Sequence, residues 1–104
     1  MSDNPIGNLV QDFGATKQFI GSVGTTSTAV PAVAGDFIAT ALIRCPQQTP
    51  NTRILFYSFD DVVFTKLSPG EFIIWPTKGN LTQIFIKGNV ASVDYEVILN
   101  REPT

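Results

Sequence analysis

The clearest pattern in the chain is an alternation of apolar and polar residues from 91 to 99. The odd positions hold Ala91, Val93, Tyr95, Val97 and Leu99, and the even positions hold Ser92, Asp94, Glu96 and Ile98. Successive side chains of a β-strand point to opposite faces, so the odd set can enter a core while most of the even set meets water. This segment is predicted to be a half-buried strand.

Shorter segments of the same character precede it. Strands are predicted at 17–22, 37–45, 53–59, 62–67, 72–75 and 82–87. The segment 37–45 is apolar on both faces and is expected to lie centrally in a sheet. The segment 24–34 contains Pro31, which cannot donate to a ladder, so we expect it to lie at an edge or in a loop.

Turn residues separate these segments. In Ser68-Pro69-Gly70-Glu71 the proline presets φ and the glycine accepts a positive φ, which predicts a type II turn. Pro76 is predicted to end the strand that begins at residue 72, with a turn at 77–80. Gly88-Asn89 is typical of a tight hairpin.

Seven or eight short strands, and no segment typical of a ten-residue helix, predict an all-β fold, either an antiparallel β-sandwich or a jelly roll. With 104 residues the chain has room for one domain, assigned to 17–104. Residues 1–16 are assigned to an extended N-terminal arm. Its apolar residues Leu9, Val10 and Phe13 belong either to a frayed terminus or to a strap that orders on a neighbouring subunit.

The aromatic residues raise the question of what covers the sheets. Ile73 and Trp75 share one face of their strand, and Phe72 and Ile74 share the other. A second sheet can cover one of these faces, and a subunit contact or a carbohydrate must cover the other. Trp75 is the best candidate for an exposed anchor, with burial in the core as the alternative.

Candidate catalytic chemistry is sparse. The chain has no histidine, which excludes Ser-His-Asp and Cys-His arrangements. Asp60, Asp61 and Glu71 are interpreted as a turn pair and a strand-edge charge rather than as catalytic carboxylates. Cys45 is the only cysteine, so we expect a small buried hydrophobe and no zinc site. No enzymatic activity, metal or cofactor is predicted.

Charge and hydropathy limit the partners. Seven Lys and Arg against nine Asp and Glu give a net charge of −2, which argues against nucleic acid as a partner. Only 15% of residues are charged, which suggests that a partner covers part of the surface, with a chemically plain globular surface as the alternative. No segment has the length of a membrane span, and the N-terminus lacks the pattern of a signal peptide. We therefore expect no membrane association, and assembly in a cytoplasm.

The C-terminal half carries a recognisable series of motifs: Ile54-Leu55-Phe56-Tyr57, Leu67-Ser68-Pro69-Gly70-Glu71, a return strand reaching Trp75, Ile84-Phe85-Ile86-Lys87-Gly88 and Val93-Asp94-Tyr95-Glu96-Val97. This series resembles small virion proteins of tailed bacteriophages. The resemblance implies a β-sandwich that decorates a capsid or builds part of a neck or tail, usually as a symmetric oligomer, without catalytic residues.

The expected function is therefore that of a structural protein of the virion. A head decoration or cement protein is favoured, one that binds between capsid subunits and stabilises the head. Its partners would be the major capsid protein or other virion proteins, together with further copies of itself. Two alternatives stay open: a tail or neck component, and a carbohydrate-binding module for host recognition that displays Tyr57 and Trp75.

Overall fold

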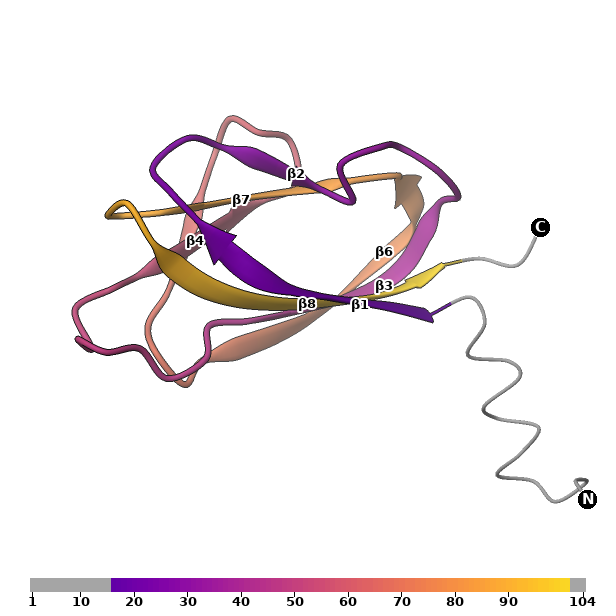
Figure 1. Ribbon diagram of the computed structural model, residues 1–104. Helices are drawn as coiled ribbons and strands as arrows, with labels where there is room; N and C mark the ends of the chain where they lie inside the picture. Colours follow the sequence, from indigo (N-terminus) through magenta and orange to yellow (C-terminus); the bar gives the residue numbers. More distant parts are fainter. Residues whose placement is uncertain (1–15, 102–104) are drawn as a thin grey trace, which may run out of the picture.

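The structure is a computed structural model that describes residues 16–101, and in it two antiparallel sheets face each other (Figure 1). The strands are β1 (Thr16–Val23), β2 (Thr28–Val30), β3 (Ile38–Arg44), β4 (Leu55–Ser58), β5 (Thr65–Leu67), β6 (Phe72–Leu81), β7 (Ile84–Gly88) and β8 (Val93–Arg101). The predicted all-β sandwich is confirmed. Among the described residues no helix is long and apolar enough to cross a membrane.

The order of the strands identifies a jelly roll. Sheet A has the order β1-β8-β3-β6, and sheet B has the order β2-β7-β4-β5. The pairs β1/β8, β2/β7, β3/β6 and β4/β5 are all antiparallel, so the first four strands run against the last four in reverse order. The further pairs β3/β8 and β4/β7 join this folded ribbon into two sheets. Such a nested pairing is the double Greek key of a jelly roll.

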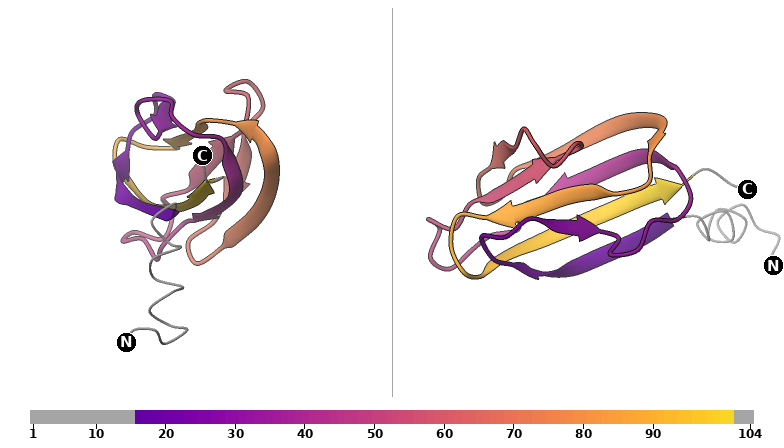
Figure 2. Two further views of the ribbon diagram at one scale, coloured as in Figure 1. Left: turned by 90° about the vertical axis from the view of Figure 1, so that its right-hand side faces the viewer. Right: turned by 90° about the horizontal axis from the view of Figure 1, so that it is seen from above.

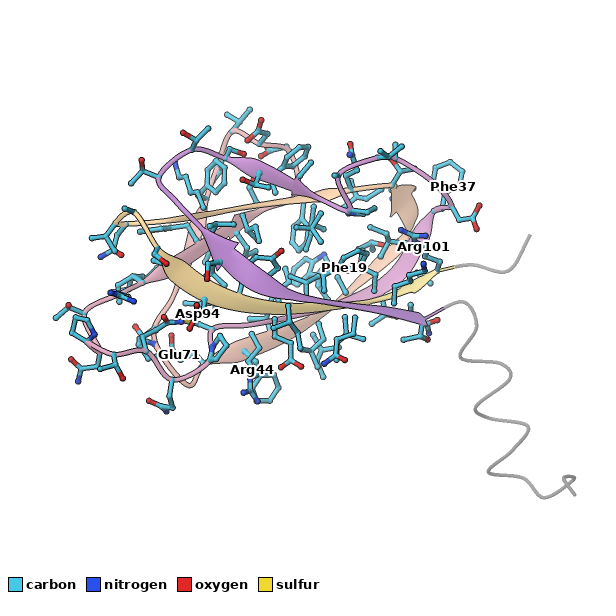
Figure 3. The ribbon with its side chains drawn as sticks, in the orientation of Figure 1. Phe19, Phe37, Arg44, Glu71, Asp94 and Arg101 are labelled. Atoms are coloured by element: carbon cyan, nitrogen blue, oxygen red, sulfur yellow. The ribbon has the colours of Figure 1, made fainter. Side chains whose placement is uncertain are left out.

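The core lies between the inner faces of the two sheets. Val93, Val97 and Leu99 of β8 are fully buried, as the alternation from 91 to 99 predicts. Phe19 of β1 pairs with Val97 and lies between the sheets (Figure 3). Ile43 of β3 pairs with Val97 from the other side and is also fully buried. β3 lies between β8 and β6, which confirms its predicted central position.

The strand β6 continues through Pro76, so the predicted strand end and the turn at 77–80 are wrong. The N–H of Cys45 donates to the carbonyl of Glu71 (2.9 Å), so the main chain of Cys45 faces β6. Counting back along β3 from Cys45, the N–H and C=O groups of every second residue therefore also point toward β6. By the same alternation the nitrogen of Pro76 points to the free edge of β6. No ladder hydrogen bond is lost there, and the strand does not have to stop. The left panel of Figure 2 shows β6 curving along one side of the sandwich.

The strand predicted at 62–67 is shorter because a capped turn occupies its first residues. The N–H groups of Val62 and Val63 both donate to Asp60 Oδ1, at 2.9 and 3.0 Å. Asp61 has a φ of 62°, which Asp tolerates better than a β-branched residue does. The chain therefore enters β5 only at Thr65.

Two other predictions are confirmed. The N–H of Glu71 donates to the carbonyl of Ser68 (2.9 Å) and Gly70 has a φ of 89°, as a type II turn requires. Cys45 is fully buried, and burial raises the pKa of its thiol. Beside it the buried Gln48 donates from Nε2 to the carbonyl of Asp94 (2.9 Å), which ties the β3–β4 loop to β8.

Candidate binding surfaces

One candidate surface is the outer face of sheet A, the face turned away from sheet B. Its side chains form rows that run across the strands, because register partners share a face. One row consists of Ile20, Glu96, Arg44 and Phe72. The next row consists of Gln18, Ile98, Leu42 and Ile74. Apolar residues from all four strands therefore lie next to one another.

This face exposes several large apolar side chains. Ile20 is 69% exposed, Ile74 is 59% exposed and Phe72 is 57% exposed. Leu42 and Ile98, in the middle of the sheet, are partly exposed. No other part of residues 16–101 covers the side chains of Phe72 and Ile74, so the cover expected from the sequence is not supplied within the described chain. An apolar strip of this kind is typical of a surface that contacts another molecule.

Two charges in the middle of the outer face, Arg44 and Glu96, are paired with each other. Arg44 Nε lies 3.2 Å from Glu96 Oε1, and Gln18 Nε2 donates to Glu96 Oε2 at 2.6 Å. Arg44 projects from this face, on the side of the sheet opposite Phe19 (Figure 3). A partner that covers the strip would therefore meet a neutral pair, which costs less to desolvate than a lone charge.

The second candidate surface is an aromatic pocket of about 620 Å³ between the β4–β5 side of sheet B and β6 of sheet A. Tyr57 and Phe59 meet edge to face, with ring centroids 5.7 Å apart. Phe59 stacks on Trp75, with centroids 5.6 Å apart. Its remaining lining residues are Asp60, Val63, Thr65 and Leu81. Trp75 is 51% exposed, so it is neither a fully buried core residue nor a free surface anchor.

Asp60 places a carboxylate at the rim of this pocket. Hydrogen bonds from the N–H groups of Val63 and Val62, and from the Ser58 hydroxyl, hold the pKa of Asp60 below its ordinary value of 3.8. The carboxylate is therefore ionised at neutral pH. Among the side chains that the structure describes, none of those lining the pocket is Lys or Arg, so a ligand here would meet aromatic faces, a hydroxyl and a negative charge.

The structure brings together two of the residues proposed from the sequence. Tyr57 and Trp75 line the same pocket, joined through Phe59. Leu9, Val10 and Phe13 lie outside the described residues.

No family model matches this chain. Neither a curated protein nor a solved structure shows significant similarity to it. The candidate surfaces therefore rest on their own geometry.

From the sequence, none of Phe59, Asp60 and Ile20 was assigned to a binding surface, and Asp60 was interpreted only as a turn residue. The adjacent apolar pair Phe19-Ile20 was a signal for the last of these, because one of two neighbours on a strand must point away from the core. Only the pairing with β8 decides which of the two does so. For Phe59 the decisive contact, with Trp75, comes from the other sheet and leaves no local signal.

The acidic residues considered as catalytic have turn contacts. Asp60 caps the β4–β5 loop, and Asp61 accepts a hydrogen bond from the Ser27 hydroxyl. Glu71 Oε1 accepts the N–H of Ser68 (2.7 Å) within the type II turn. Among residues 16–101 no group of three or more His, Cys, Asp or Glu side chains is placed to hold a metal ion.

Proposed function

We propose that the protein is a non-enzymatic structural protein of a phage particle that docks through the outer face of sheet A. A head decoration or cement protein, which binds between capsid subunits, is the favoured assignment. The observation that supports this proposal is the exposed apolar strip of Ile20, Phe72 and Ile74. Covering it would release ordered water and contribute roughly 25 cal/mol for each Å² buried, before the entropic costs of association.

Two further observations agree with this function. The resemblance of the C-terminal half to virion proteins of tailed phages supports the assignment to a phage particle. The jelly roll is an architecture that viral capsid proteins and lectins share, so the fold alone does not choose between them. The exposed strip favours assembly, because a lectin does not require an apolar sheet face.

The test is a co-sedimentation of the purified chain with particles of the phage that encodes it. We expect Ile20→Lys to weaken binding by about tenfold or more, because an ammonium group would be buried against apolar surface without a partner. The matched control is Val62→Lys, which changes a comparably exposed apolar residue in the β4–β5 loop. Unchanged binding by the Ile20 variant, or absence of the chain from the particle, would contradict the proposal.

A carbohydrate-binding module is the second candidate, favoured by the aromatic pocket. Trp75 and Tyr57 offer apolar ring surface, and Asp60 and Thr65 offer hydrogen-bond acceptors to sugar hydroxyls. A glycan array separates the two functions. Glycan binding that disappears in Trp75→Ala while particle binding is retained would establish a carbohydrate-binding function at the aromatic pocket.

A further inference from the structure

The aromatic pocket combines ring surfaces with a single negative charge. The carboxylate of Asp60 lines it together with the hydroxyl of Thr65 and the rings of Tyr57, Phe59 and Trp75. Its volume of about 620 Å³ is in the range of pockets that hold small molecules, roughly 300–1,000 Å³. The chemistry of this lining indicates which class of small molecule would bind.

The carboxylate of Asp60 is held in place by one of its two oxygens. Oδ1 accepts hydrogen bonds from the Ser58 hydroxyl (2.8 Å) and from the N–H groups of Val62 (2.9 Å) and Val63 (3.0 Å). Among the groups that the structure describes, none donates to Oδ2. A ligand with an N–H group therefore finds an acceptor that is already fixed, so little side-chain entropy is lost on binding.

The described lysines of sheet B lie away from this charge. Lys66 of β5 and Lys87 of β7 are both register partners of Phe56, so all three side chains share the outer face of sheet B. Tyr57 and Thr65, which pair with each other and line the pocket, project from the opposite face. The negative charge of Asp60 is thus left for a ligand to neutralise.

The rings supply the second requirement of a cation site. Trp75 is 51% exposed, so part of its indole ring is open to a ligand although Phe59 stacks on it. The faces of aromatic rings attract cations, and Trp does so most strongly. A planar guanidinium group can stack on an indole and can also donate N–H groups to a carboxylate. A neutral sugar would cover Asp60 without pairing its charge, which carries a desolvation cost.

We propose that the aromatic pocket is a binding site for a small organic cation, and that a guanidinium group is the preferred cation. Its N–H groups would donate to Asp60 Oδ2 and to the Thr65 hydroxyl, and the apolar part of the ligand would contact Val63 and Leu81. The inference goes beyond docking through sheet A and does not depend on it. Carbohydrate, the other ligand class considered for this pocket, becomes an outcome of the test.

The test is isothermal titration calorimetry of the full chain with butylguanidinium chloride. Its matched ligand is butylurea, which has nearly the same shape and no charge. We expect saturable binding of butylguanidinium and binding of butylurea that is weaker by about fivefold or more. Trp75 is the single tryptophan, so its emission should change with the same dissociation constant and locate the ligand in the pocket.

Two variants test the role of the carboxylate. Asp60→Asn keeps one oxygen for the turn and removes the charge, so the preference for butylguanidinium should fall below about twofold. Asp61→Asn is the matched control, because it removes the same charge from a side chain that bonds Ser27 and does not line the pocket. Asn also tolerates the φ of 62° at this position. This variant should keep the preference of the wild type, and circular dichroism checks that both variants are folded.

Three results would overturn the inference. They are equal binding of the two compounds by the wild type, a preference that survives Asp60→Asn, and tighter binding of methyl glucoside than of butylguanidinium. The last of these would assign the pocket to carbohydrate. All the measurements use the free chain without particles, so their outcome is independent of the test for docking.

Discussion

Trp75 of β6 stacks on Phe59, which follows β4, with ring centroids 5.6 Å apart and planes inclined by 27°. This contact joins the two sheets on the side where the sandwich is bounded by β5 and β6. Both rings also line the aromatic pocket. The stability of the fold and the shape of a candidate site therefore depend on the same pair of rings.

Replacing Phe59 should both destabilise the protein and alter the pocket. Phe59 is half-buried and packs against the core, so Phe59→Ala is expected to lower the free energy of unfolding by about 1–3 kcal/mol. The emission of Trp75, the single tryptophan, should shift to longer wavelength. Urea denaturation and fluorescence measure the two effects. The control is Phe72→Ala on the exposed outer face, for which a loss below about 1 kcal/mol is expected. Equal losses for the two variants would contradict the assigned packing.

Gly88 is expected to tolerate no side chain. A Cβ at this position would lie 2.5 Å from Val93 Cγ2, inside the closed end of the β7–β8 connection. Gly88→Ala should therefore cost about 1–3 kcal/mol through overpacking. Gly35→Ala is the control, since its Cβ would make an ordinary contact of 3.7 Å with Arg101, and we expect a change within about 0.5 kcal/mol. Thermal unfolding compares them, and a neutral Gly88 variant would show that β7 and β8 are farther apart than described.

The buried thiol of Cys45 predicts a loss of stability in alkali. Its pKa is raised in the folded chain, mainly because burial disfavours the thiolate, while the unfolded chain ionises near the ordinary value of 9.0. The stabilisation is therefore fully present below pH 9 and declines as the pH rises through 9 and beyond. Denaturation at pH 7 and pH 10 should show a smaller loss for Cys45→Ala than for the wild type. An equal loss in the two proteins would refute this role for Cys45.

Asp60 predicts a dependence of stability on pH at the acid end. Its pKa is lowered in the folded chain, chiefly by the N–H groups of Val63 and Val62, so its contribution is present above pH 3.8 and is lost as the pH falls below that value. Asp60→Asn keeps an acceptor oxygen in the turn but does not titrate. Acid unfolding followed by circular dichroism should therefore be less steep for this variant. A curve identical to that of the wild type would remove Asp60 from the account.

The fold was predictable from local alternation wherever one face of a strand is buried. The inner set of β8 follows the pattern from 91 to 99, and the type II turn follows from Pro69 and Gly70. The course of β6 was not predictable, because whether Pro76 breaks a strand depends on which neighbour its nitrogen faces. The candidate surfaces were predictable in part. Trp75 was identified, but its partner Phe59 was not, because that contact joins two sheets.

The proposed contact between the outer face of sheet A and a protein of the virion is tested most directly by site-specific photo-crosslinking in assembled particles. A benzophenone side chain is placed at position 20 in one sample and at position 62 in another, both of them exposed apolar positions. The account predicts a crosslink to another virion protein from position 20 and none from position 62. Crosslinks from position 62 alone would contradict it.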